Sequence, residues 1–286
     1  MRLEHGSVSV LCVSDGLPTA LPLAPTLQPL GSSPRAVMDR LARLGFAAIE
    51  LSIDQPAFHP RAFDASSRRG LLSVLRQRGL KLAGIDAFLP PQLFHDPAHV
   101  DQVVSTLTEA IDLAADLMPA AAAPGTLGVG VHFPSPEPAH GEEQETLSEA
   151  GENKNGHELS SVVAVIEKAA QRGVPLIDFR ADGLWADRDL VMRGIDCLAV
   201  LRGGGDPVKA VHHAGDRLLS LRLADQHSDG TPRPLDGGAH GFDLLGLKVA
   251  LSVNGYAAPV VVTSRGWADP WAGLIQTQQA WASHAG

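Results

Sequence analysis

The sequence contains little cysteine, few aromatic residues and no cluster of basic residues. Its two cysteines, Cys12 and Cys197, each lie within an apolar run, which predicts buried thiols in a reducing compartment rather than a disulfide framework. Asp and Glu outnumber Lys and Arg by 32 to 23, and no basic stripe is present that could bind a phosphate backbone. We therefore expect no nucleic-acid partner.

Long hydrophobic runs are also absent. The Ala-rich stretch at 114–124 is shorter than the roughly 18 apolar residues of a membrane span, and the first apolar run has flanks too polar for a signal peptide. These features predict a cytoplasmic protein without a membrane partner. Hydrophobic residues nevertheless make up 44% of the chain, which is enough for the core of one large α/β domain.

Short apolar runs alternate with amphipathic helical patterns along the chain. The runs are mostly continuous, which is typical of parallel strands covered on both faces. No G-x-G-x-x-G motif follows the first run, so an open dinucleotide-binding sheet is the weaker alternative. The pattern predicts a single (β/α)₈ TIM barrel over residues 1–286. We expect strands at 9–13, 47–53, 81–88, 127–133, 175–180, 194–200, 218–225 and 259–264.

Helix boundaries are marked by capping residues and glycines. Four Ser-Pro or Asp-Pro pairs place a capping side chain before a proline at the first helical position. Five glycines suit the left-handed position that follows a helix. The pairs begin at Ser33, Asp96, Asp206 and Asp269, and the glycines are Gly45, Gly79, Gly173, Gly215 and Gly255. Between the fifth and sixth strands, residues 181–193 are too few for a full-length helix.

One segment, residues 134–157, departs from this pattern. It is rich in Pro, Gly, Glu, Ser and Asn, and residues 137–158 hold seven Glu and one Lys. Because it has almost no apolar content, we expect a flexible acidic insertion after the fourth strand. The alternative is a mobile lid, since this loop leaves the barrel on its carboxyl face.

Polar residues gather where the predicted strands end, which is the working face of a parallel barrel. Carboxylates and imidazoles there can hold a hard cation or move protons. Some also have a structural interpretation: Glu50 can pair with an Arg, His132 can be a satisfied interior histidine, and Asp196 can cap a turn. Likewise, Asp225 can anchor its loop, and His240 can be solvated in a Gly-rich loop. The strand-end set is Glu50, Asp54, Asp86, His132, Asp178, Arg180, Asp196, Arg222, Asp225, His227, Thr263, Ser264 and Arg265.

Residues 44–51, with the sequence LGFAAIEL, resemble the "G-(F/Y)-x-x-(I/V)-E" strand of the xylose-isomerase-like TIM-barrel family. That family includes sugar and sugar-acid isomerases and epimerases. The likeness continues at 110–114, at Val131-His132, from Gly215 to Asp225 and at Gly255-Tyr256. It covers most of the chain through the order and spacing of these pieces. The resemblance implies a barrel enzyme acting on a small sugar-like molecule, with a divalent metal bound at the strand ends.

The family binds its metal through a Glu on strand five, an Asp on strand six, a His on strand seven and a Glu on strand eight. By register, these positions correspond here to Phe179, Asp196, Arg222 and Thr263. Only Asp196 retains a ligand type, whereas Arg222 brings a permanent positive charge. We therefore expect the usual metal site to be lost and no cofactor to be needed. A relocated Mn, Mg or Zn site built from His132, Asp178 and Asp196 is the alternative.

Two functions from different classes follow from this set. The first is an isomerase or epimerase that transfers a proton next to a carbonyl, with Glu50 or Asp178 as base and His132 as the partner acid. Arg222 would stabilise the oxyanion in place of a metal. The expected substrate-binding residues are Asp225, His227, His240 and Arg265. The second is a catalytically degenerate barrel that binds a small anionic ligand or a protein partner, because the substitutions fall on the metal positions while the scaffold signals are intact.

Three tryptophans lie near the end of the chain, at Trp267, Trp271 and Trp281. Large aromatic side chains occur both in cores and at protein interfaces. They therefore indicate either core packing or the interface of a homo-oligomer.

Overall fold

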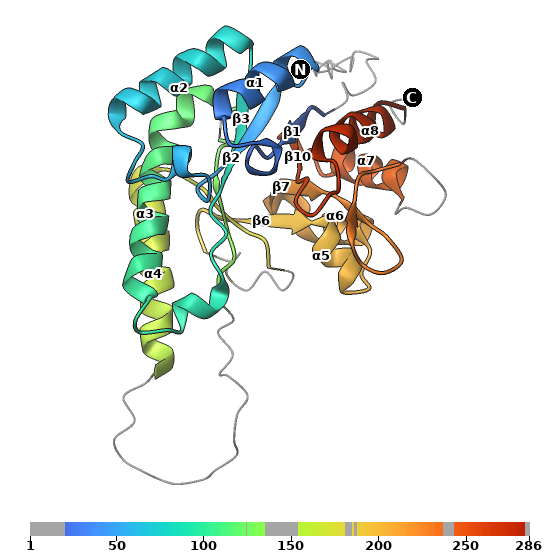
Figure 1. The fold of residues 1–286 in the computed structure, drawn as a ribbon. Coiled ribbons are helices and arrows are strands. Elements are labelled where there is room, and N and C mark those ends of the chain that lie inside the picture. Colours follow the sequence, from blue (N-terminus) through green and yellow to red (C-terminus); the bar gives the residue numbers. More distant parts are fainter. Residues whose placement is uncertain are drawn as a thin grey trace, which may run out of the picture.

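The computed structural model describes residues 21–123, 125–134, 154–180, 185, 188–236 and 243–283, without the side chains of 154–159. In these parts of the chain, eight parallel strands pair in the order β1-β10-β7-β6-β5-β4-β3-β2. They curve into a barrel with helices on its outer side (Figure 1). The strands are β1 (Leu23–Pro25), β2 (Ala48–Ser52), β3 (Lys81–Asp86), β4 (Val129–Val131), β5 (Leu176–Asp178), β6 (Val191–Asp196), β7 (Leu218–Leu223) and β10 (Val260–Val262).

Strands and helices alternate along the chain, as a (β/α)₈ barrel requires. Among the described residues, no helix joins β5 to β6, whereas two short helices, α5 and α6, join β6 to β7. A small hairpin of β8 (Asp225–Gln226) and β9 (Pro232–Arg233) follows β7. The helices are α1 (Pro34–Arg43), α2 (Ala65–Arg78), α3 (Val100–Leu117), α4 (Lys154–Arg172), α5 (Cys197–Arg202), α6 (Pro207–Ala214), α7 (Leu244–Val253) and α8 (Pro270–Ser283).

The barrel closes where the ends of β1 and β2 meet. Thr26, which follows β1, forms an isolated parallel bridge with Glu50 of β2. The backbone N–H of Leu27 donates to the carbonyl of Glu50 at 3.1 Å. This closure places the side chains of Thr26 and Glu50 next to each other at the carboxyl end of the barrel.

Small side chains fill the barrel interior on the amino side of Thr26 and Glu50. A cluster separate from the main core contains Ala24, Ala48, Ala83 and Val261. Alternate residues of a strand share a face, so Thr26 and Glu50 point to the same side as the alanines two positions before them. The interior therefore changes from apolar to polar towards the strand ends.

The strand predictions agree with the structure except at two places. The segment 9–13 lies outside the described residues, and the first barrel strand is β1. The strand predicted at 194–200 is placed too late, because β6 runs from Val191 to Asp196 and Cys197–Arg202 forms helix α5. The Asp196 carboxylate accepts hydrogen bonds from the backbone N–H groups of Leu198 and Ala199, which starts a helix at this point.

The helix signals are confirmed except at Ser33 and Asp96. Residues Ser33, Asp206 and Asp269 directly precede helices that begin with proline. The side chains of Asp206 and Asp269 accept backbone N–H groups of the first turn, whereas that of Ser33 makes no capping hydrogen bond. Asp96 instead accepts from the N–H of Ala98 in a turn, and α3 begins only at Val100. The five predicted glycines all have positive φ, between 57° and 85°.

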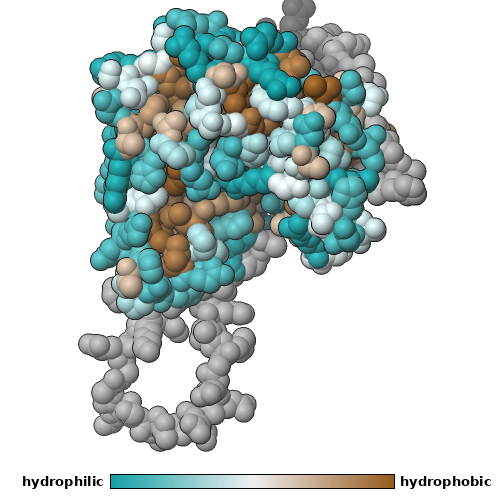
Figure 2. Space-filling view, viewed as in Figure 1, coloured by the Kyte–Doolittle hydropathy of each residue, from teal (hydrophilic) through white to brown (hydrophobic). Residues whose placement is uncertain are grey.

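The predicted insertion extends too far at its carboxyl end, because α4 already begins at Lys154; residues 135–153 lie outside the described part. No described helix combines the length and apolar content needed to cross a membrane. The face shown in Figure 2 is mostly hydrophilic, with apolar residues in separate small groups.

Candidate functional site

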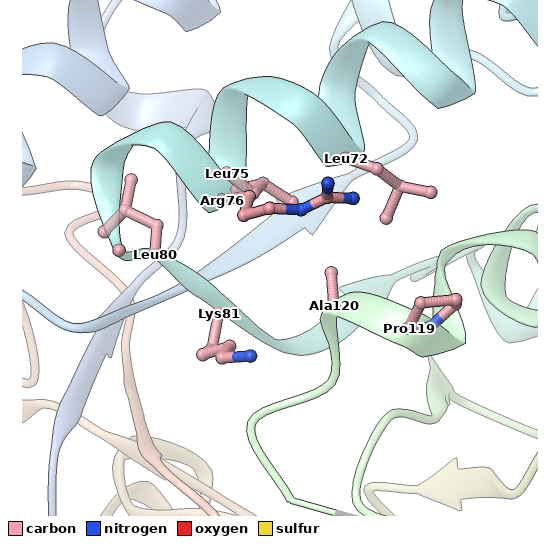
Figure 3. Close-up of a pocket in the computed structure, with 8 residues that line it drawn as sticks. Leu72, Leu75, Arg76, Leu80, Lys81, Pro119 and Ala120 are labelled. Carbon is pink, nitrogen blue, oxygen red and sulfur yellow. The ribbon is translucent and has the colours of Figure 1, made fainter.

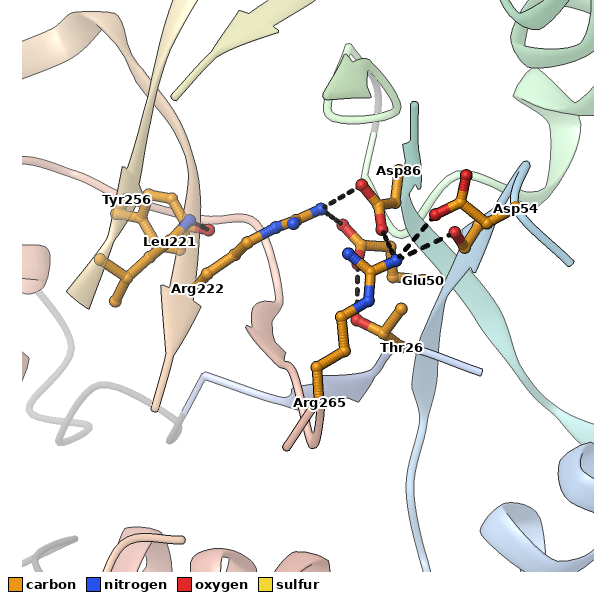
Figure 4. A network of polar contacts seen from close by, with 9 residues as sticks. Thr26, Glu50, Asp54, Asp86, Leu221, Arg222, Tyr256 and Arg265 are labelled. Atoms are coloured by element: carbon orange, nitrogen blue, oxygen red, sulfur yellow. Dashed lines mark hydrogen bonds and ion pairs between the residues drawn. The ribbon is translucent and has the colours of Figure 1, made fainter. Parts of the chain in front are cut away.

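Arg222 occupies the centre of the barrel mouth. It lies on β7 opposite Asp196 of β6, and 3% of its side chain is exposed. Its Nη2 donates to Glu50 Oε1 at 2.8 Å and lies 3.2 Å from Asp86 Oδ1 (Figure 4). The guanidinium therefore joins β7 to β2 and β3 on the other side of the barrel.

Two aromatic rings bracket this guanidinium. The Cζ atom of Arg222 lies 4.0 Å from the ring centroid of Phe88 and 4.6 Å from that of Phe179, distances at which a cation and a ring attract each other. Gly194 leaves room for Phe179, because a Cβ there would lie 2.7 Å from the ring. At Gly130 a Cβ would lie 3.2 Å from the same ring. Glycines on β4 and β6 thus allow aromatic side chains to cover the charge.

The carboxylate of Glu50 is fully engaged by neighbours. The Thr26 hydroxyl donates to its Oε2 at 2.6 Å, and Arg222 donates to Oε1. Burial raises the pKa of the Glu50 carboxyl; the charge of Arg222 opposes this rise and that of Asp86 adds to it. Burial also disfavours the charged form of Arg222, but the two carboxylates outweigh it and raise the pKa of the guanidinium.

A second arginine completes the charged network from the end of β10, the strand next to β7. Arg265 follows β10, and its Nη2 donates to Asp86 Oδ2 at 2.7 Å. Longer contacts of 3.3 and 3.4 Å join it to Ser52 Oγ and Asp54 Oδ2. Burial, together with the charge of Asp86, raises the pKa of Asp54, and Arg265 opposes that rise. Charges therefore alternate from Glu50 through Arg222, Asp86 and Arg265 to Asp54 (Figure 4).

His132 lies beside this network at the end of β4. Its ring centroid is 4.1 Å from that of Phe88. Its Nε2 is buried and has no hydrogen-bond partner in the described structure. Burial lowers the pKa of His132, and the charge of Arg222 lowers it further, against smaller opposing effects of Asp196 and Asp86. Burial therefore favours the neutral form of the imidazole.

Asp178 and Asp196 contact backbone groups. Asp178 Oδ1 accepts from the N–H of Arg180 at 3.2 Å and from that of Phe133 at 3.5 Å. Neighbouring residues of an extended chain point to opposite faces. Because the Phe179 ring faces Arg222, the side chain of Asp178 leaves β5 on the other face. Asp196 caps helix α5 and is thus anchored at its Oδ1.

The remaining predicted substrate ligands lie in or beyond the β8–β9 hairpin. Asp225 accepts from Arg233 Nη2 at 2.7 Å and from the N–H of Gln226 at 2.8 Å, and so anchors this hairpin. His227 lies in the hairpin turn, where its N–H donates to the Thr231 carbonyl. His240 lies outside the described residues.

The structure brings together Glu50, His132, Arg222 and Arg265 from the predicted set, and it adds residues that sequence reasoning left without a role. Thr26 was missed because the first strand was placed too early. Asp86 was noted only as a strand-end acid. Phe88 follows Asp86 by two positions, which was the available signal that both face the same side.

The site does not fit the divalent metal that the family resemblance implies. The permanent charge of Arg222 would repel a cation at the barrel axis. Asp196 is already bonded to two backbone amides. Across the described residues, no group of three or more His, Cys, Asp or Glu side chains is arranged to hold a metal ion; this includes the alternative set of His132, Asp178 and Asp196.

A cavity of about 140 Å³ lies away from this site. It is located at the start of β3, between the end of α2 and the short helix Met118–Ala120 (Figure 3). That is the amino end of the barrel strands, opposite the face on which parallel barrels carry their active sites. The charged network at the strand ends is therefore the better candidate for a functional site.

Comparison with solved structures identifies the architecture. A xylose isomerase domain protein from Planctomyces limnophilus aligns over 93% of this chain and 96% of its own, with a TM-score of 0.63 and 13% identity. The chain has the fold of the xylose-isomerase-like TIM barrels. A D-allulose 3-epimerase from Methylomonas sp., solved in complex with D-allulose, aligns over 94% of this chain and 98% of its own, with a TM-score of 0.65 and 16% identity.

Not every xylose-isomerase-like neighbour is an isomerase or epimerase. A probable 3-DHS dehydratase from Bacillus anthracis aligns over 91% of this chain and 97% of its own, with a TM-score of 0.62 and 12% identity. No family model matches the sequence, and comparison with curated proteins finds no relative. Because identities are this low, the likeness establishes the fold, and the reaction has to be argued from the site.

Proposed function

We propose that this chain is a sugar or sugar-acid isomerase or epimerase that moves a proton next to a carbonyl, without a divalent metal at the barrel centre. The observation that carries this proposal is the pairing of a fixed positive charge with a neutral base. Arg222 and His132 both pack on Phe88, and the charge of Arg222 acts on the imidazole; we place the substrate carbonyl within reach of both.

In this mechanism, His132 is the base. Its lowered pKa keeps the ring neutral, and Nε2 accepts the proton that leaves the carbon next to the carbonyl. The electrons of that C–H bond form an enediolate, whose negative charge is stabilised by the nearby guanidinium of Arg222. Delivery of this proton to the neighbouring carbon, with the hydroxyl proton passing between the two enediolate oxygens, gives the isomer. An epimer forms when a proton from solvent or a second acid instead reaches the opposite face of the original carbon.

Glu50 and Asp86 are positioning residues in this proposal. Both carboxylates already bind Arg222, and Glu50 also accepts from Thr26. Their contacts hold the guanidinium across the barrel before a substrate arrives, which removes the cost of reorganising it during the reaction. This arrangement favours His132 over Glu50 as the base.

The sugar-like substrate is supported by the structural neighbours. The Methylomonas barrel was solved with D-allulose, and a further neighbour from Clostridium cellulolyticum H10 is a D-psicose 3-epimerase solved with D-tagatose. Both align over more than nine tenths of this chain. A polyhydroxylated carbonyl compound also suits the alternating charges and hydroxyls at the mouth.

Incubation with keto sugars and keto sugar acids in D₂O tests the proposal. Proton abstraction replaces the C–H next to the carbonyl by C–D, which NMR detects whichever product is formed. We expect His132→Gln to lower this exchange by roughly 10²–10⁴-fold. The control His213→Gln, which changes an exposed histidine on α6, should leave it intact.

Equal exchange in the wild-type protein and His132→Gln would contradict the assigned base. Exchange that depends on added Mn²⁺ and stops with a chelator would contradict the metal-free mechanism. Saturable binding of sugars without any exchange would show a binding barrel instead of an enzyme.

A further inference from the structure

Arg265 leaves two of its guanidinium nitrogens without a hydrogen bond in the described structure. All of its contacts within the described structure go to one nitrogen, Nη2, which serves Asp86, Ser52 and Asp54. Its Nε and Nη1 make no hydrogen bond there and are not among the buried polar atoms without a partner. The side chain is 35% exposed. Both forks of a guanidinium include Nη2, so a carboxylate that displaces Asp54 can pair with Nη2 and with one of the two remaining nitrogens, Nε or Nη1.

A hydroxyl without a hydrogen-bond partner among the described residues lies close to Arg265 in the sequence. Thr263 follows β10 and precedes Arg265 by two residues. Its register places it on the inward face, since Val261 pairs with Arg222 and alternate residues share a face. The Thr263 side chain is partly exposed, and in the described structure its hydroxyl has no hydrogen-bond partner. It can therefore donate to the same anion.

Arg222 and Arg265 differ in what they leave for a ligand. Arg222 is buried between two rings and two carboxylates. Arg265 is bound firmly only to Asp86, because its contact with Asp54 is 3.4 Å long and Asp54 is 49% exposed on its side chain. An incoming carboxylate can take the place of Asp54 while Asp86 keeps the guanidinium anchored.

From this geometry we infer that the substrate carries a carboxylate, which displaces Asp54 and is bound by Arg265 and the Thr263 hydroxyl at the mouth of the barrel. The inference rests on the proposed function and narrows it from sugars in general to keto sugar acids. The carboxylate lies on the β10 side of the mouth, and the carbonyl extends towards Arg222 and His132.

Matched pairs of small molecules test the inference. D-Gluconate and D-glucitol differ by a carboxylate in place of a hydroxymethyl group, and calorimetry measures their binding without needing turnover. 2-Keto-D-gluconate and D-fructose form the same kind of pair for exchange in D₂O. We expect the wild-type protein to prefer the acid in each pair.

Arg265→Gln should weaken binding of gluconate and raise the KM for 2-keto-D-gluconate by roughly 10- to 100-fold, the usual effect of losing hydrogen bonds to a charged group. Arg265→Lys should weaken binding of the acids by a smaller factor, because lysine keeps the positive charge but lacks the paired N–H groups of a guanidinium. Thr263→Val should lose less than Arg265→Gln. D-Fructose and D-glucitol should respond little, and Arg69→Gln, an exposed charge on α2, controls for net charge. The acid-to-neutral ratio within each variant is independent of the fraction folded.

Two results separate this inference from the proposed function. Exchange with no preference for the acid, or equal losses for acid and neutral compounds in Arg265→Gln, would overturn the inference and leave the enzyme proposal standing. Binding of gluconate that depends on Arg265, without exchange of any keto compound, would support the inference and overturn the enzyme proposal.

Discussion

Replacing Arg222 by methionine removes the positive charge at the barrel axis while keeping most of the side-chain length. Glu50, which is 3% exposed, then remains buried with only the Thr26 hydroxyl as a partner, whereas Asp86 keeps Arg265. Removing one member of a buried ion pair typically costs about 3–5 kcal/mol. We therefore expect the free energy of unfolding to fall by about this amount, a large share of the ~5–15 kcal/mol that stabilises a folded protein.

The cost should depend on pH and on Glu50. Without Arg222, the folded-state pKa of Glu50 lies further above its unfolded value, so protonation stabilises the folded variant. The loss should therefore shrink as pH falls from about 8 towards 5, relative to the wild-type protein. Adding Glu50→Gln to Arg222→Met removes one unpaired charge and should recover part of the stability.

Urea unfolding of the four proteins in this double-mutant cycle, followed by circular dichroism at several pH values, measures both effects. Arg233→Met is a matched control, because that arginine also pairs with a buried Asp but is 14% exposed and lies outside the barrel axis. The reasoning would be refuted if Arg222→Met lowered the free energy of unfolding by less than about 1 kcal/mol, or if the loss were the same at pH 8 and pH 5. A buried carboxylate that has lost its charged partner should destabilise the fold by more than this.

Three further results follow from the contacts. Gly194→Ala should cost about 1–3 kcal/mol in urea unfolding, because the added Cβ would lie 2.7 Å from the Phe179 ring; Gly70→Ala, in open space on α2, should not destabilise. Tyr256→Phe should lower the free energy of unfolding by about 1–3 kcal/mol, because the buried hydroxyl accepts from the N–H of Leu221 on β7 and donates to the carbonyl of Pro259. No change in the free energy of unfolding would show that water replaces the hydroxyl. Because burial lowers the pKa of His132, proton exchange should stay level as pH falls to about 6.5 and decline only below it; a decline beginning above pH 7 would contradict a neutral, buried base.

Several features of the site were accessible from the sequence because they follow from local order. Strand ends carry the working residues of any parallel barrel, so Glu50, His132, Arg222 and Arg265 could be named without coordinates. The pairing of Arg222 with Glu50 was also among the expected structural interpretations, and it is observed at 2.8 Å. The anchoring role of Asp225 and the capping role of Asp196 are confirmed in the same way.

Other features could not be read from local order. Phe88 was counted as the end of a strand, and nothing in its neighbourhood along the chain indicates a cation above its ring. The first strand was placed on the apolar run at 9–13, since apolar content alone does not tell a barrel strand from another apolar segment. The short β1, Leu23–Pro25, is specified mainly by its pairing with β10 and its contact with β2.

The sequence by itself determined the alternation of strands and helices, the glycines that end the helices and the set of polar residues at one end of the barrel. These depend on periodicity and backbone preference, which act over a few residues. Only the tertiary structure decided which charges meet. Arg222 and Glu50 are 172 positions apart, and their contact depends on barrel closure and on the room that Gly130 and Gly194 leave for the aromatic rings. Such distances across a barrel arise from the packing of all its strands, and no local pattern records them.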